Sequence, residues 1–166
     1  RFGRVDDGTA VTDFDEEAVA RKHTLSASPA YFEWQQCKVN LLDTPGAGNF
    51  VSDARAALRI VDAAIVVVDA VAGVQVSTEK VWETAAELAL PRLIVCHRLD
   101  RDRASLSRTM ESLRGSFGRG CVPVQLPIGE EKTFHGVIDL VTMRAATFAP
   151  DGSGKMITGA IPDALA

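Results

Sequence analysis

The chain has 166 residues, of which 46% are hydrophobic and 24% are charged, and its formal net charge is −4. This composition is typical of a globular domain with enough residues for one core, and the acidic balance argues against a nucleic-acid-binding face defined by charge. The longest apolar run, residues 63–68, is far too short to span a bilayer.

The chain begins Arg-Phe-Gly-Arg without an initiator methionine and ends Ala-Leu-Ala, so we expect an internal fragment of a longer protein. Its three cysteines, Cys37, Cys96 and Cys121, are far apart in the sequence. That spacing indicates neither a disulfide framework nor a metal site, and we expect reduced core thiols.

The first part of the chain predicts a loop followed by a hairpin. Residues 1–28 are polar and rich in glycine and aspartate, which indicates a loop with one short helix over 15–21. Two β-rich runs follow, at 31–35 and 38–42, and predict an antiparallel hairpin.

The hairpin ends in a turn that leads into alternating helices and strands. Residues 43–46 precede a helix predicted over 49–61, and residues 63–69 are apolar on both faces, as in a strand buried within a parallel sheet. The next element expected is a helix capped by Ser77, with Val81, Trp82, Ala85 and Leu88 on its core side. A strand at 92–96 and a loop at 97–100 follow it. The last helix of this series is expected to bury Leu106, Met110, Leu113 and Phe117. Strands that alternate with helices predict a doubly wound α/β sheet.

Beyond Gly120 the pattern changes to short strand candidates separated by glycine and proline. These candidates, at 122–128, 133–140 and 143–148, predict a β-rich insert, and residues 150–166 read as loop. Elsewhere, the tryptophans Trp34 and Trp82 are expected to pack in the core or at its margin.

Two acidic loops follow predicted strands, at the edge where open α/β sheets bind ligands. Asp43 can hold Mg²⁺ through water, and Gly46 lets a backbone N–H approach a phosphate oxygen. In the second loop, Asp100 can accept two hydrogen bonds from a guanine edge while a flanking cation packs on the base. Taken singly, each loop is equally typical of a plain turn or a helix cap.

Several motifs occur together in a fixed order: Asn-Leu-Leu-Asp-Thr-Pro-Gly at 40–46, the apolar strand and turn at 64–75, Leu-Asp-Arg at 99–101, and the segments 122–129 and 134–140. The first three resemble the GTP-binding domain of translational GTPases, above all elongation factor G. The last two are similar to the insert that elongation factor G carries within that domain. The likeness covers roughly residues 1–148.

The resemblance implies a P-loop NTPase-type doubly wound sheet that lacks its first strand and phosphate loop and is followed by a β-rich insert. It implies a partial GTP-binding domain at 1–120, the start of the insert subdomain at 121–150, and a loop or truncated end at 151–166. No Gly-x-x-x-x-Gly-Lys-Ser/Thr motif occurs in the sequence. In the family fold the missing strand lies between those ending at Asp43 and Asp69, so we expect two unpaired apolar strand edges and a marginally stable or aggregating chain.

The resemblance also implies roles for single residues. Thr24 looks like the first-switch threonine that closes over Mg²⁺ and the γ-phosphate, although its segment departs from the commoner Arg-Gly-Ile-Thr. Asp43 looks like the second-switch carboxylate that binds Mg²⁺ through water, and Gly46 like the glycine whose N–H senses the γ-phosphate. Asp100 looks like the residue that selects guanine. The cofactors implied are GTP or GDP and Mg²⁺.

Two sites, at 47 and at 97–98, depart from the family pattern. Ala47 stands where the family has a histidine that orients the attacking water, so no catalytic side chain is expected there. His97-Arg98 stands where Asn-Lys is usual, but Arg98 keeps a cation able to stack on guanine. The histidines His23 and His135 have no second ligand at metal spacing, so zinc is not expected.

The function implied is that of a cytoplasmic, monomeric protein that binds the ribosome and hydrolyses GTP to drive translocation or ribosome recycling, with neither a membrane nor DNA as partner. One alternative is a hydrolysis-impaired paralogue that binds guanine nucleotide and acts as a ribosome-binding module, and Ala47 is its main support. Another is an α/β domain without nucleotide chemistry, in which these loops are only turns. The chain alone is expected to bind GTP negligibly, because it lacks the groups that grip the α- and β-phosphates.

Overall fold

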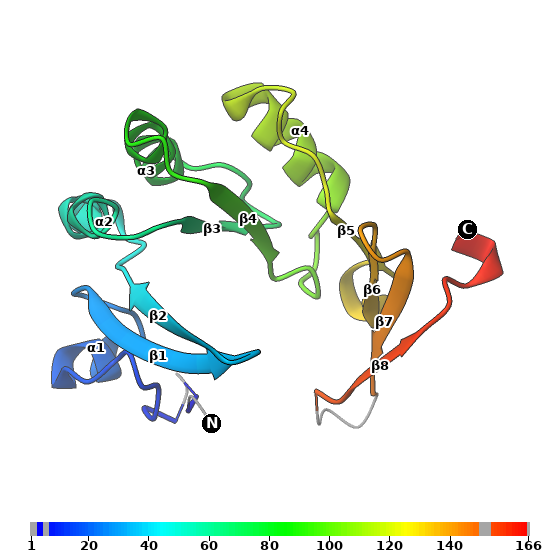
Figure 1. Cartoon of the computed structure of the whole chain (residues 1–166), viewed down its shortest axis with the longest axis horizontal. Helices are drawn as coiled ribbons and strands as arrows, with labels where there is room; N and C mark the ends of the chain where they lie inside the picture. The colour runs from blue at the N-terminus through cyan, green and yellow to red at the C-terminus, as the bar shows by residue number, and fades with distance from the viewer. Residues whose placement is uncertain (1–2, 5–6, 150–153, 166) are drawn as a thin grey trace. The chain divides into compact units, whose positions relative to one another are not determined.

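The computed structural model describes residues 3–4, 7–149 and 154–165 (Figure 1). Its helices and strands, in chain order, are α1 (Glu16–Arg21), β1 (Ser28–Trp34), β2 (Cys37–Asp43), η1 (Gly48–Phe50), α2 (Val51–Ala57), β3 (Ala64–Asp69), α3 (Val76–Glu87), β4 (Arg92–His97), α4 (Leu106–Phe117), β5 (Gln125–Ile128), η2 (Glu131–Thr133), β6 (Gly136–Asp139), β7 (Arg144–Phe148), β8 (Met156–Gly159) and η3 (Asp163–Leu165). The chain divides into two compact units, residues 1–66 with 76–93 and residues 67–75 with 94–166. Within the described residues, no helix is long and apolar enough to cross a membrane.

Helix α1 confirms the short helix predicted near the start of the chain. The Asp15 side chain caps it by accepting a hydrogen bond from the Glu17 N–H at 2.7 Å. Lys22 ends the helix in the left-handed conformation, with φ 56°. The predicted loop around this helix includes residues 1–2 and 5–6, which lie outside the described residues.

Strands β1 and β2 form the predicted antiparallel hairpin, joined by Gln35 and Gln36. Both turn residues have positive φ, which matches a two-residue turn whose twist suits a hairpin. Side chains directly opposite share a face, so one face of the hairpin is apolar except for Ser28 and Asp43 at its open end. We call this the hairpin face, and it consists of Ala30, Phe32, Trp34, Cys37, Val39 and Leu41.

The hairpin face is largely exposed, which corrects two expectations from the sequence. Trp34 is 67% exposed and Cys37 is exposed, although Trp34 was expected in the core or at its margin and Cys37 in the core. A hairpin is a single layer, and its apolar side is buried only where a second layer packs on it. Of the other two cysteines, Cys121 is buried as expected and Cys96 is half-buried, where burial raises the pKa of its thiol.

Replacing one residue of the hairpin face should make the 166-residue chain less prone to associate. We expect Val39→Lys to raise the monomer fraction at a given concentration, because a lysine on an exposed edge strand opposes pairing with a second chain. The matched control is Asn40→Lys, which adds the same charge next to it on the opposite face. Size-exclusion chromatography over a concentration series measures the effect, and equal elution of both variants and the original chain would contradict the prediction.

Helix α2 is shorter than predicted. It is preceded by the 3-10 turn η1 and ends at Ala57, so the expected helix over 49–61 is too long at its C-terminal end. The N–H groups of Arg59 and Ile60 bond to carbonyls only three residues back, at Ala56 and Ala57. The last turn therefore tightens and the helix cannot continue through Val61.

Strands β3 and β4 pair in a two-stranded sheet. Where the two strands begin, the Ala64 N–H donates to the Pro91 carbonyl at 2.9 Å. Where they end, the Ala70 N–H donates to the His97 carbonyl, also at 2.9 Å. Since the two contacts run in the same order along both strands, the strands are parallel. This agrees with the predicted strand, helix and strand connection through α3.

Strand β3 is buried on one face only, which corrects the expectation that both faces are buried. Val66 and Val68 are 8% and 1% exposed, whereas Ile65 and Val67 are 59% and 60% exposed. Alternate side chains of a strand point to opposite faces, so one complete face of β3 is uncovered. A continuous apolar run shows that both faces of a strand can be buried. It does not show whether other helices or strands pack on both faces.

Helix α3 agrees with the predicted core stripe in part. Ala85 is fully buried, and Trp82 is half-buried with the Arg92 guanidinium 4.3 Å from its ring centroid. Leu88 is 40% exposed. The helix begins at Val76, so Ser77 lies inside its first turn and the predicted cap is wrong.

The start of α4 is tied to the end of β3. Ser105 caps α4, where its side chain accepts a hydrogen bond from the Arg108 N–H. The Ala70 carbonyl accepts hydrogen bonds from the Ser105 N–H and the Thr109 hydroxyl, both at 3.3 Å. Thr109 is 1% exposed, so this contact lies in the interior of the second unit.

The predicted β-rich insert is a four-stranded antiparallel sheet in the order β5-β6-β7-β8. Its core contains Ile128, Ile138 and Ala145. Strand β8 occupies residues predicted as loop, because four residues carry too short a pattern and the strand is defined by its pairing with β7. Residues 150–153 and 166 of that predicted loop lie outside the described residues.

Candidate nucleotide-binding site

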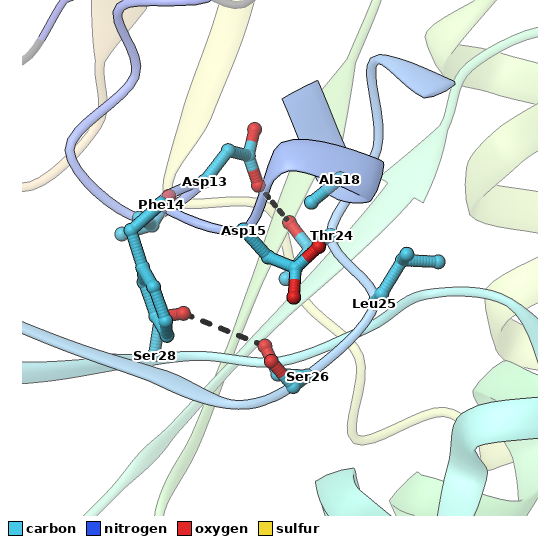
Figure 2. A pocket seen from close by; sticks show the side chains of 9 residues that line it. Asp13, Phe14, Asp15, Ala18, Thr24, Leu25, Ser26 and Ser28 are labelled. Atoms are coloured by element: carbon cyan, nitrogen blue, oxygen red, sulfur yellow. Dashed lines mark hydrogen bonds between the residues drawn. The ribbon is translucent and has the colours of Figure 1, made fainter. Parts of the chain in front are cut away.

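The hydroxyl of Thr24 lies between two carboxylates. Its Oγ1 is 3.1 Å from Asp13 Oδ1 and 3.3 Å from Asp43 Oδ2. Figure 2 shows the contact with Asp13, which is itself only 8% exposed. Three segments of the first unit therefore bring together three oxygen ligands of the kind that Mg²⁺ prefers. The structure thus brings together Thr24 and Asp43, to which the resemblance gives switch roles.

Asp13 is the residue of this cluster that sequence reasoning missed. Helix α1 lies between Asp13 and Thr24, and the left-handed Lys22 reverses the chain at its end. The His23 N–H also bonds back to the Ala18 carbonyl at 3.3 Å. A short helix that is closed in this way returns the chain toward its own start and so brings Thr24 to Asp13.

A shallow pocket lies beside this cluster, with Asp13, Phe14, Ser26 and Ser28 among its lining residues (Figure 2). Ser28 is 2% exposed, and its hydroxyl donates to the Ser26 carbonyl at 3.5 Å. In the part of the chain that the structure describes, no buried side-chain nitrogen or oxygen lacks a partner. The pocket therefore does not by itself require a ligand.

In the turn after β2, Gly46 and Ala47 both have free space beside them. A Cβ added at Gly46 would meet no atom within 4 Å, so the space beside its backbone is free. Ala47 is exposed and extended, and its carbonyl accepts a hydrogen bond from the Phe50 N–H at 2.9 Å. A larger side chain at position 47 would project from the turn without displacing a neighbour.

The base-recognition loop, which we define as residues 97–105, connects β4 to α4. Arg98 has the left-handed φ of 61°, and its Nη1 lies 2.8 Å from Asp69 Oδ2. His97 and Asp100 are exposed. The three residues expected to form the guanine pocket thus lie in one loop of the second unit.

Asp69 is the second residue whose part in the site sequence reasoning missed. Its Oδ1 accepts hydrogen bonds from the N–H groups of Val71 and Ala72, at 2.7 and 3.2 Å. The bond from Val71, followed by those from Arg98 and Ala72, holds the pKa of this carboxyl below its usual value despite some loss of solvation. Gly73 closes the turn with φ 70°.

The two groups of expected site residues belong to different units. Among the described residues, no three histidine, cysteine, aspartate or glutamate side chains are grouped to hold a metal ion. His23 and His135 instead contact backbone carbonyls, those of Arg21 at 3.0 Å and Thr133 at 2.8 Å.

Comparison with known proteins gives one family. The model of the elongation factor Tu GTP binding domain matches residues 2–158. Elongation factor G of Mycoplasma pneumoniae is 36% identical over 163 residues, and elongation factor G 2 of Streptomyces coelicolor is 40% identical over 163 residues. Both alignments cover 98% of this chain and 24% of the relative.

A solved structure gives the same result for the fold. The crystal structure of ttk003000868 from Thermus thermophilus superposes with a TM-score of 0.88 at 36% identity, over 99% of this chain and 24% of that one. The chain thus spans about a quarter of the length of the proteins it matches. The α/β fold predicted from the sequence is confirmed, and the chain belongs to the family of elongation factor Tu GTP binding domains.

Proposed function

We propose that this chain is the switch and base-recognition part of a longer cytoplasmic, monomeric protein similar to elongation factor G, which hydrolyses GTP on the ribosome during translocation or recycling. The observation that carries the proposal is the position of the Thr24 hydroxyl, 3.1 Å from Asp13 and 3.3 Å from Asp43. These residues come from both segments that the resemblance assigns to nucleotide-dependent switches. The family match argues against a domain whose loops are only turns.

The oxygen ligands around Thr24 fit Mg²⁺. We assign Thr24 as a direct ligand and Asp43 as a ligand through water, with Asp13 supporting the Thr24 hydroxyl. If Mg²⁺ were bound, it would supply positive charge that neutralises charge on nucleotide phosphates. Thr24 would then offer its hydroxyl oxygen as a ligand, and Asp13 and Asp43 would position that hydroxyl.

The guanine-binding part of the site consists of three residues of the base-recognition loop. The exposed carboxylate of Asp100 can accept two hydrogen bonds from the guanine edge. Arg98 supplies a planar cation that stacks on the base, and His97 replaces the usual asparagine beside it. The N–H of Gly46 stands open to approach by a γ-phosphate oxygen. The division into parts at 1–120, 121–150 and 151–166 stays a prediction.

Titration calorimetry with GTP, GDP and ATP tests the proposal. We expect the 166-residue chain alone to bind GTP negligibly, because its sequence holds no motif that grips the α- and β-phosphates. The full-length protein that contains this segment should bind GTP and GDP and prefer both to ATP. If the full-length protein binds neither guanine nucleotide, the proposed function is wrong.

A further inference from the structure

The start of the base-recognition loop is held by Asp69, which lies outside it at the end of β3. One oxygen of Asp69 is fixed by the N–H groups of Val71 and Ala72, and the other lies 2.8 Å from the Arg98 guanidinium. Beside this contact, the main chain after β3 is joined to the main chain at the end of β4, because the Ala70 N–H donates to the His97 carbonyl at 2.9 Å. The start of the loop is therefore anchored through the main chain of His97 and the side chain of Arg98.

The far end of the loop is held by Glu131, which lies outside it in the 3-10 turn of the insert. Its Oε1 accepts a hydrogen bond from the Arg103 N–H at 2.8 Å. Arg108 donates from its guanidinium to the Arg103 carbonyl, so both the N–H and the carbonyl of Arg103 are hydrogen-bonded. A nearby ion pair between Lys132 and Asp102, at 3.5 Å, is largely exposed and contributes little.

The insert places Glu131 through a turn that only glycine permits. Gly129 leaves β5 with φ 84°, and a Cβ there would lie 2.1 Å from the Thr133 carbonyl oxygen. The same turn is closed by Glu130 and Thr133, whose side chains bond to each other's backbone N–H groups. The position of Glu131 is thus set within the insert and not by the loop that it contacts.

Both anchored residues have conformations that a free loop would avoid. Arg98 and Arg103 have φ values of 61° and 66°, in the left-handed region that non-glycine residues rarely adopt. Asp100 lies between them with its side chain exposed. Its carboxylate makes no hydrogen bond or ion pair with another described residue, so its direction depends on the backbone that the two anchors hold.

We propose that Asp69 and Glu131 are positioning residues for guanine recognition, one acting through Arg98 and the other through the Arg103 backbone. Together they present Asp100 to the base edge in one orientation, which gives the insert a part in base selection. This inference rests on the proposed function, since it assumes that Asp100 contacts the base.

The test measures how well the full-length protein distinguishes GDP from inosine diphosphate, which lacks the 2-amino group. Asp69→Asn keeps an oxygen for the Val71 and Ala72 N–H groups but removes the charge that holds Arg98. Glu131→Ala removes the acceptor for Arg103, and Glu131→Gln restores a neutral one. The matched control is Asp139→Asn. Asp139 Oδ1 accepts hydrogen bonds from the N–H groups of Val141 and Thr142, just as Asp69 Oδ1 does from those of Val71 and Ala72. In the described residues, however, Asp139 forms no ion pair.

We expect Asp69→Asn and Glu131→Ala each to lower the ratio of GDP to inosine diphosphate affinity about tenfold, the usual size for losing a group that orients a ligand contact. Glu131→Gln should restore most of the ratio, and Asp139→Asn should leave it unchanged. Should Asp69→Asn fail to fold, the Glu131→Ala and Glu131→Gln pair tests the proposal independently.

The possible failures are distinguishable. A full-length protein that prefers GDP to ADP but keeps its GDP to inosine diphosphate ratio in both Asp69→Asn and Glu131→Ala overturns the inference and leaves the proposed function in place. An equal fall in affinity for both nucleotides also overturns it, because it shows a structural role without an effect on base selection. A full-length protein that binds GDP no better than ADP contradicts the proposed function itself.

Discussion

Replacement of Asp100 by asparagine is expected to lower the affinity of the full-length protein for GDP by about 100-fold or more, since two charge-assisted hydrogen bonds are lost. The carboxylate accepts from both donors on the guanine edge, whereas the asparagine amide presents a donor of its own toward one of them. Xanthine carries a carbonyl where guanine has its 2-amino group, so Asp100→Asn should bind xanthosine diphosphate more tightly than the unaltered protein does.

Titration with GDP and xanthosine diphosphate measures this change. The matched control is Asp102→Asn, which removes a charge from the same loop at an exposed position paired with Lys132. Unchanged GDP affinity in Asp100→Asn would show that another residue selects the base. Equal losses in both variants would show that loop charge, and not contact with the base edge, matters.

Replacement of Ala47 by histidine is expected to speed GTP hydrolysis by the full-length protein on the ribosome by about 10²–10⁴-fold, the usual contribution of a positioned polar group. A methyl group cannot orient water, whereas an imidazole can. Ala47 is exposed at the start of the 3-10 turn, so the larger side chain can be accommodated without disturbing the fold.

Single-turnover hydrolysis with ribosomes measures the rate, and Ala47→Phe is the control that adds a ring without a polar atom. A gain with histidine alone would show that the unaltered protein hydrolyses GTP slowly because Ala47 cannot orient the water. No gain with histidine would show that another group already orients the water, and it would remove the main support for a hydrolysis-impaired paralogue.

The sequence predicted several elements well because their patterns are local. The hairpin follows from two β-rich runs, and the helix α4 follows from apolar residues at helical spacing. The loop between β4 and α4 was predicted for the same reason. Strand β8 was missed because its pairing with β7 is not encoded in its own four residues.

Burial was predicted less well. An apolar side chain indicates a face that can be buried, but not whether another layer covers it, as Trp34, Ile65 and Val67 show by their exposure. The residues that hold the site were missed for a related reason. The contacts of Asp13 with Thr24 and of Glu131 with Arg103 depend on where the chain returns after a turn, which spacing alone does not give.

The carbonyl of Ala70 has a consequence for the order of folding. It accepts from the Ser105 N–H and the Thr109 hydroxyl, which are far away along the chain. These two hydrogen bonds cannot form until α4 has docked on the end of β3. The chain between Ala70 and Ser105 must therefore close into a large loop before either bond stabilises the fold. The base-recognition loop therefore acquires its native shape late, in the same step that completes the interior of its unit.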